Sequence, residues 1–427
     1  MHNVFYLGVI QAGNYILPLI TIPYLVRVLG TENFGLLSFA IAFIAYFQIA
    51  VDYGFSLSAT REVSLIRNDR DKLSSLFFSV ILVKSAISAV CAVCLIGLLA
   101  VFSRIFPDSH LYLFLFLGVV GNILFPSWLF QGKEEMGFIT FFGLLGKVIS
   151  TGLIFILIKK PGDYIWYAYL SSFTAWIVGI TGFIVALKRY RLRPIFINRK
   201  SLWRCLKDGW EIFVSTASVS LFTNSNTFIL GLFTNNSVVG MFAIADKIVR
   251  AVIYLCAPFC NAVFPRTSYL FSESRQRALV YLRKFLLAGS SLFAFLSAML
   301  FILADLLVVL VSGAKNSEIA LLIRIMFFLP LSVFIDNIFG TQIMLNCNLK
   351  KQFMRIILGG GIFSLMLLLI LVPRLHAFGS AISFGISELF IVVLMILTVR
   401  KAGIRLFKVS DVRQQPGAVA SHTKRDI

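Results

Sequence analysis

Long apolar segments alternate with short polar stretches along the whole chain. A bilayer core about 30 Å thick needs roughly 20 apolar residues per helical crossing, and twelve segments meet that length. They lie at 4–28, 34–56, 74–102, 110–131, 137–158, 163–187, 209–233, 238–264, 285–312, 318–346, 354–373 and 376–399. The pattern predicts an all-α polytopic membrane protein with twelve transmembrane helices.

The composition agrees with this pattern, since 59% of the 427 residues are hydrophobic and only 14% are charged. A soluble protein would carry about a quarter charged residues. The first segment has no basic start or small-residue cleavage site, and prolines interrupt its apolar core. We therefore interpret residues 4–28 as a permanent span, not a cleaved signal peptide.

Basic residues are distributed unequally between the loops on the two sides. With the N-terminus inside, the cytoplasmic stretches hold 28 of the 39 Lys and Arg residues, the opposite side holds 6, and 5 lie within spans. Cytoplasmic loops of membrane proteins carry such an excess, so we predict cytoplasmic N- and C-termini. The net charge of +20 is then mainly a topology signal, and because no loop is long enough to fold into a module, we expect no nucleic-acid binding.

The longest basic loop divides the chain near its middle and suggests two six-helix lobes. FGLLSFAIA resembles VGMFAIA, which places Gly35 over Gly240 at an offset of 205 residues; chance similarity between apolar helices is the alternative. Transporters built from such repeats bind substrate between the halves, so we expect a central cavity. The predicted parts are a lobe at 1–187, a basic cytoplasmic linker at 188–208, a lobe at 209–399 and a basic cytoplasmic tail at 400–427.

Polar residues recur along the first span at the three- and four-residue spacing that puts them on one helical face. This stripe comprises Gln11, Asn14, Pro18, Thr21, Tyr24 and Arg27. Pro18 and Pro23 each free a backbone carbonyl and are expected to act as hinges of a bent helix, because such kinks persist where neighbours or water satisfy the carbonyl. The stripe faces either a cavity or a polar helix–helix contact. We favour the cavity and predict that Gln11, Asn14, Thr21, Tyr24 and Arg27 bind substrate.

The seventh span, which the repeat places over the first, carries a similar polar face. It comprises Thr216, Ser220, Thr223 and Thr227, with Asn224 and Asn226 beside it. Two symmetry-related polar faces favour one shared central cleft. We therefore predict that Thr216, Ser220, Thr223 and Asn226 bind substrate.

The eighth span contains three charged residues within AIADKIVRAV. Asp246 and Arg250 are one helical turn apart and can pair, which leaves Lys247 uncompensated. A lone charge at mid-bilayer costs at least ~2.5–3.5 kcal/mol, so Lys247 should face water or a ligand. All three are predicted to bind substrate, with a purely structural ion cluster as the alternative for Asp246 and Arg250.

No residue set typical of catalysis is found. The four histidines lie at span ends or in tails, and no phosphate-binding loop or H-E-x-x-H motif occurs. The six cysteines lie in apolar segments without nearby histidines, where packing is the better interpretation. We predict no metal site, no cofactor and no enzymatic activity.

Three stretches resemble the Wzx-type O-antigen flippases of the multidrug/oligosaccharidyl-lipid/polysaccharide exporter superfamily. They are NYILPLITIPYLVRVLGTENFG, DYGFSLSATREVS and PSWLFQGKEEM. The matching positions are Asn14, Pro18, Pro23, Tyr24, Arg27, Gly30 and Gly35, then Asp52, Tyr53, Gly54 and Arg61, and finally Pro126, Trp128, Gln131, Gly132 and Met136. The second half of the chain resembles the family only in its layout of spans.

The resemblance implies a MATE-like fold that carries undecaprenyl-diphosphate-linked oligosaccharide to the periplasmic leaflet of a Gram-negative inner membrane. It also implies alternating access, a cationic central cavity, coupling to an ion gradient, and contact with membrane lipid and other O-antigen assembly proteins. Through the motif matches we add Asp52 and Arg61 to the substrate-binding candidates.

Two other functions compete with this one. A drug:cation antiporter of the same superfamily should have an uncompensated carboxylate in its first helices that faces the cleft. The first span has none, and the only candidate in these helices is Asp52, near the cytoplasmic end of the second span. An O-antigen polymerase or membrane glycosyltransferase should have a large or carboxylate-bearing outer loop, whereas the outer loops here are short.

Overall fold

The computed structural model describes residues 2–103, 105–106, 108–194, 198–404 and 406, and every regular element in these ranges is helical. The first half contains α1 (His2–Asp52), α2 (Phe55–Leu65), α3 (Arg70–Val101), α4 (Ser109–Ile123), α5 (Ser127–Gly132), α6 (Met136–Leu157), the short 3₁₀ helix η1 (Pro161–Asp163) and α7 (Tyr164–Arg189). The second half contains α8 (Arg199–Phe233), α9 (Asn236–Ile253), α10 (Cys256–Glu273), α11 (Arg275–Ile302), α12 (Ala304–Ser312), α13 (Ser317–Met326), α14 (Leu329–Asn337), the π-helix η2 (Ile338–Met344) and α15 (Lys350–Lys401). The prediction of an all-α membrane protein is confirmed.

Within the described residues, 8 helices or continuous helical stretches are long and apolar enough to cross a membrane. Two of them contain a sharp backbone break, at Gly30 in α1 (φ 76°, ψ 168°) and at His376 in α15 (φ 51°, ψ −125°). Gly30 falls between the predicted spans 4–28 and 34–56, and His376 is the first residue of the predicted span 376–399, directly after the span 354–373. A positive φ ends helical geometry, and at Gly30 the missing Cβ makes it inexpensive.

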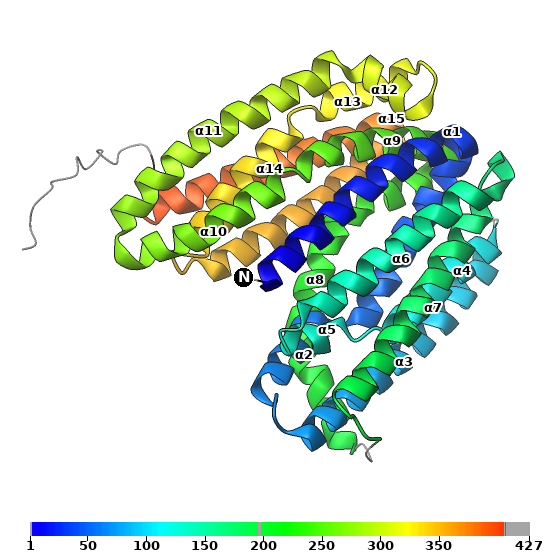
Figure 1. Cartoon of the computed structure of the whole chain (residues 1–427). Helices are drawn as coiled ribbons and strands as arrows, with labels where there is room; N and C mark the ends of the chain where they lie inside the picture. Colours follow the sequence, from blue (N-terminus) through cyan, green and yellow to red (C-terminus); the bar gives the residue numbers. More distant parts are fainter. Residues whose placement is uncertain (1, 104, 107, 195–197, 405, 407–427) are drawn as a thin grey trace, which may run out of the picture.

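The helices form two groups that are joined at one end and separate toward the other (Figure 1). Helices α2–α7 make up one group and α9–α15 the other, while α1 and α8 run between them. The buried side chains follow the same division. One hydrophobic core draws on both groups, a second is confined to α10, α11, α14, η2, α15 and its C-terminal end, and a third to α2, α3, α5, α7 and the adjacent Leu192.

Glycines bring α1 and α9 into backbone contact at the joined end. A Cβ added to Gly35 on α1 would lie 1.8 Å from the carbonyl oxygen of Asn236, and one added to Gly240 on α9 would lie 1.9 Å from that of Thr31. Neither distance leaves room for a side chain, so α1 and α9 touch through small residues, as membrane helices often do. The two glycines that the proposed repeat aligns therefore lie at the same crossing.

Candidate functional site: a cationic cavity between the helix groups

A cavity of about 420 Å³ lies between α1, α6, α7, α8 and α9, together with Tyr254 directly after α9. Its wall is partly apolar, with Leu17, Ile22, Phe34 and Leu37 among its members. The polar and charged lining residues are Thr21, Ser38, Lys147, Ser150, Thr151, Tyr167, Asn224, Thr227, Asp246, Lys247, Arg250 and Tyr254. Both helix groups contribute to the wall, because α6 and α7 belong to one and α9 belongs to the other.

The charges of the cavity are predominantly positive. Among the lining residues that the structure describes, three are cations and one is a carboxylate. Arg250 Nε lies 2.8 Å from both carboxylate oxygens of Asp246, so these two residues form the predicted pair. The Arg250 guanidinium also lies 5.3 Å from the ring centroid of Phe384, a cation–π contact that supports it from α15.

Lys247 differs from its neighbours on α9. Its side chain is exposed to the cavity, and it makes no hydrogen bond or ion pair with the part of the chain that the structure describes. The neighbouring residues Asp246, Ile248 and Val249 are buried against other helices, so Lys247 is the accessible residue in this turn of α9. This arrangement suits a lysine that binds an anion, because its charge is available to a ligand.

The α6 wall supplies a set of residues that the sequence analysis left out of the binding site. Lys147, Ser150 and Thr151 all line the cavity. Gly146 faces the other way, since a Cβ there would lie 2.8 Å from Val178 on α7. The available signal was the spacing of these three polar residues by three and four positions on an otherwise apolar helix, which puts them on one face.

The polar stripe of α1 reaches the cavity only in part. Pro18 and Thr21 line it, and the Thr21 hydroxyl donates to the carbonyl of Leu17 at 3.0 Å. For Gln11 and Asn14 the side chains lie outside the described part of the molecule, so their roles stay predictions. Pro18 and Pro23 both lie inside α1, and no residue of this helix other than Gly30 has non-helical backbone angles; their hinge role is likewise still a prediction.

Tyr24 and Arg27 do not line the cavity, contrary to the expectation that the whole stripe would face it. The Tyr24 hydroxyl donates to the carbonyl of Ile158 at 2.7 Å, at the end of α6. Arg27 Nη2 donates to the carbonyl of Leu310 on α12. A helical stripe drifts around the axis along its length, and near Gly30 the neighbours of this face are helix ends.

The residues predicted on the seventh span divide in the same manner. Asn224 and Thr227 line the cavity, and Asn224 donates to the Ser220 hydroxyl at 2.7 Å, so Ser220 orients a cavity residue. Thr216 donates to the carbonyl of Ile212 within its own helix, and Asn226 is buried away from the cavity wall. The side chain of Thr223 lies outside the described residues.

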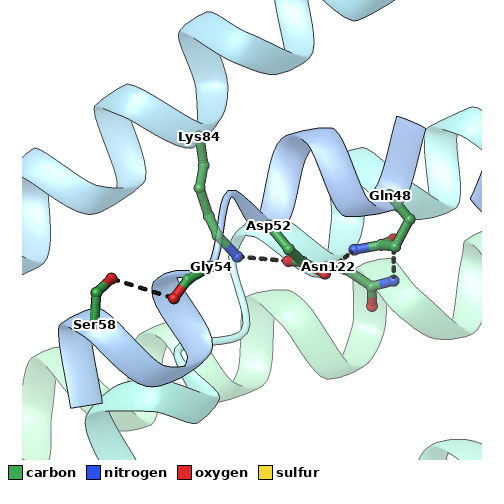
Figure 2. Close-up of polar contacts among 6 residues, drawn as sticks. All are labelled: Gln48, Asp52, Gly54, Ser58, Lys84 and Asn122. Atoms are coloured by element: carbon green, nitrogen blue, oxygen red, sulfur yellow. Dashed lines mark hydrogen bonds and ion pairs between the residues drawn. The ribbon is translucent and has the colours of Figure 1, made fainter. Parts of the chain in front are cut away.

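Asp52 belongs to a polar network within the first helix group (Figure 2). Lys84 Nζ on α3 lies 2.8 Å from Asp52 Oδ1, and Gln48 Nε2 donates to Asp52 Oδ2 at 2.8 Å. Asn122 Nδ2 on α4 in turn donates to the side-chain oxygen Oε1 of Gln48 at 3.4 Å. The network ties α1, α3 and α4 together, and Asp52 does not line the cavity. Arg61, also predicted to bind substrate, is exposed on α2 and lies outside the cavity wall.

The fold of this chain is similar to that of solved transporter structures, one of them described as a member of the MOP superfamily. The structure is similar to that of a multidrug resistance MATE family transporter of this superfamily in its inward-facing conformation, with a TM-score of 0.70 at 13% identity, covering 96% of this chain and 99% of the other. It is also similar to the lipid II flippase MurJ in an inward closed conformation, with a TM-score of 0.69 at 14% identity, covering 93% and 87%.

Sequence comparison assigns the family within this fold. The chain belongs to the polysaccharide biosynthesis protein family, whose model matches residues 1–271. It is 31% identical over 398 residues to the "Putative O-antigen transporter" of Escherichia coli (strain K12), covering 93% of this chain and 96% of that protein. It is also 28% identical to the protein of the same description from Shigella dysenteriae, with coverages of 93% and 99%. The resemblance drawn from the sequence motifs is thus confirmed.

Proposed function

We propose that this protein is a flippase that moves undecaprenyl-diphosphate-linked oligosaccharide repeat units from the cytoplasmic to the periplasmic leaflet of the inner membrane. The observation that carries the proposal is the cavity between the helix groups, whose wall holds three cations and one carboxylate. A diphosphate needs such cations, which bind phosphate oxygens through charge-assisted hydrogen bonds. The relatives described as O-antigen transporters support the same cargo.

The cavity wall also suits the sugar part of this substrate. Thr21, Ser38, Ser150, Thr151 and Thr227 present hydroxyl groups, and Asn224 presents a carboxamide. These groups both donate and accept hydrogen bonds, as sugar hydroxyls do. The polyprenyl tail can stay in the bilayer beside the cavity, because the hydrocarbon needs no polar partner there.

We infer twelve spans in two lobes, with both termini in the cytoplasm. The breaks at Gly30 and His376 each divide one long helix into two crossings. The eight apolar candidates then account for all predicted spans except 209–233 and 238–264. These two correspond to α8 and α9–α10, which carry Asn224, Thr227 and the α9 charges into the cavity wall.

The same inference gives the conformation and the domain boundaries. Helix α3 begins and α7 ends at the separated end of the first helix group (Figure 1). Lys72 lies in the first turn of α3, Arg189 is the last residue of α7, and Lys133 contacts Arg67 shortly before α3. This end therefore faces the cytoplasm under the positive-inside rule. The cavity is then open inward and closed toward the periplasm. The lobes are residues 1–187 and 209–399, and the linker at 188–208 already includes the first turns of α8.

Transport would proceed by alternating access coupled to an ion gradient. An inside-negative potential favours outward movement of an anionic headgroup by about 2.3 kcal/mol per charge per 100 mV. This gain shrinks if lining cations move with the substrate. The drug:cation antiporter is the less favoured alternative, because its candidate carboxylate in the first helices, Asp52, is paired with Lys84 at 2.8 Å and the cavity carboxylate, Asp246, is paired with Arg250 at 2.8 Å.

The test is the replacement of Lys247 by Ala, Arg or Glu, and of Arg250 by Ala, in a strain that depends on this protein for surface polysaccharide. We expect Lys247→Ala and Arg250→Ala to abolish surface polysaccharide, with lipid-linked repeat units accumulating on the cytoplasmic side while the protein stays abundant in the membrane. Lys247→Arg should retain part of the activity, since a diphosphate accepts point charges or forks, and Lys247→Glu should be the most severe.

Lys207→Ala serves as the matched control, because Lys207 is exposed on α8 outside the cavity wall. Normal polysaccharide in the Lys247→Ala strain would contradict the proposed anion site. Loss of the protein from the membrane in every Lys247 and Arg250 variant would support a structural ion cluster instead.

A further inference from the structure

The break in α1 at Gly30 lies at the joined end of the molecule, and side chains on both sides of it reach the ends of other helices. Tyr24 donates to the carbonyl of Ile158, which follows the last residue of α6. Asn33 donates to the carbonyl of Pro161 at 3.0 Å, in the adjacent η1. Both contacts remain within the first lobe, so they fix the break to that lobe.

Arg27 makes the corresponding contact to the other lobe. Helix α12 ends at Ser312 because Gly313 adopts a left-handed conformation (φ 78°, ψ −5°). A helix end leaves its last four carbonyls without intrahelical partners. The Gly313 backbone N–H donates a hydrogen bond to the carbonyl of Val309 at 2.9 Å, and the Arg27 guanidinium donates one to the next carbonyl, that of Leu310.

This contact is favourable for two reasons. The carbonyl end of a helix carries partial negative charge, which attracts a cation, and hydrogen bonds from charged donors are stronger than neutral ones. The Arg27 stem also packs on Gly313, where an added Cβ would lie 3.5 Å from Arg27 Cγ. Because Arg27 is exposed, water can replace the carbonyl when the helices separate.

We propose that Arg27 is a latch that holds the joined end of the two lobes closed and must release α12 before the cavity can open to that side. Of the three side chains that anchor the Gly30 break, Arg27 alone bridges the lobes; Tyr24 and Asn33 can keep their partners when the lobes move apart. Behind the latch, the Gly35–Gly240 crossing provides the backbone contact that the latch secures. The proposal rests on alternating access, but it does not depend on which substrate is carried.

The test measures access to the cavity from each side of the membrane. Ser38 lines the cavity on α1 and serves as the reporter, as Ser38→Cys in a background whose six native cysteines are replaced by serine or alanine. A membrane-impermeant thiol reagent is applied to right-side-out and inside-out vesicles. The parent should react mainly in inside-out vesicles.

We expect Arg27→Gln to raise the labelling rate in right-side-out vesicles about threefold to tenfold, as the closed state loses one charge-assisted hydrogen bond. The labelling rate of Arg27→Lys should lie between those of the parent and of Arg27→Gln, because lysine keeps the positive charge but lacks the planar guanidinium group. Asn33→Ala is the matched control, since it removes a hydrogen bond to a carbonyl at the same end within one lobe; its labelling should equal that of the parent.

A second measurement covers the case in which Arg27→Gln does not insert. Cysteines at Arg27 and Leu310, joined by a short cleavable bifunctional reagent, should block transport reversibly and confine Ser38→Cys labelling to inside-out vesicles. An unchanged labelling rate in a well-inserted Arg27→Gln protein would overturn the latch, as would transport by the cross-linked protein. Either result would leave the proposed function unaffected. Normal polysaccharide in the Lys247→Ala strain would instead contradict the proposed function without affecting the latch.

Discussion

Replacing either partner of the Asp52–Lys84 ion pair should destabilise the protein by a different amount, because the two side chains differ in burial. The Lys84 side chain is 7% exposed and that of Asp52 is 45% exposed, and their charged atoms lie 2.8 Å apart. Asp52→Asn therefore leaves a buried lysine without a carboxylate. Lys84→Met instead leaves a half-exposed carboxylate that still accepts a hydrogen bond from Gln48 at 2.8 Å.

The magnitudes follow from this difference in exposure. An uncompensated cation within the membrane costs about 2.5 to 3.5 kcal/mol, which corresponds to a change of roughly 60-fold to 300-fold in the folding equilibrium. Lys84→Met removes the ion-pair partner of a carboxylate that water reaches, which costs on the order of 0.2 to 1 kcal/mol. The double variant Asp52→Asn/Lys84→Met removes the buried charge and should recover most of the stability lost in Asp52→Asn.

Membrane abundance and the melting temperature of detergent-purified protein measure the stability, and surface polysaccharide measures transport in the same strains. We expect Asp52→Asn to be the least stable variant and the double variant to resemble Lys84→Met. Equal destabilisation by the two single substitutions would refute the reasoning from burial. A double variant that is stable but does not transport would show that Asp52 also has a direct role, as the motif resemblance implies.

Three shorter predictions concern topology, the first helix and a helix cap. Reporter fusions after Arg199 should report cytoplasm and fusions near Lys315 periplasm; the opposite pattern would reverse the assigned direction of transport. Pro18→Ala should insert normally but transport poorly. A cysteine at the cavity position Thr21 should react with a water-soluble thiol reagent. A cysteine at Leu19 should not react, because this side chain, although 52% exposed, lies outside the cavity wall. Equal labelling at the two positions would contradict the interpretation of this face of α1 as a water-lined wall. Hydrogen bonds from the backbone N–H and the side chain of Lys72 lower the pKa of Asp69, which caps α3. A lowered pKa means that the cap stabilises the ionised form, so its contribution is fully present above the ordinary pKa of Asp and is lost only as the pH falls through the lowered value. Asp69→Ala should therefore lower the melting temperature equally at pH 6 and pH 8, and a difference that varies between these pH values would contradict this account.

The sequence by itself determined the helices and their class. The hydropathy pattern predicts spans at 74–102 and 137–158, and the structure has α3 at Arg70–Val101 and α6 at Met136–Leu157. These elements follow from local rules, since a segment in the bilayer must satisfy its own backbone hydrogen bonds and does so as a helix. The Asp246–Arg250 pair was predictable for the same reason, because residues four apart meet on any helix.

Only the tertiary structure decided which polar faces share the cavity. Periodicity identifies a helical face but not its neighbour, so it grouped Tyr24 and Arg27 with Thr21, whereas the packing places them against the ends of α6 and α12. Lys147 on α6 and Lys247 on α9 are 100 positions apart in the chain and line one cavity. Asp52 meets Lys84 through the packing of α1 on α3. Such contacts depend on how helices far apart in the chain are rotated and crossed, and that is set by the whole pattern of side-chain packing and by close glycine contacts such as Gly35 with Gly240.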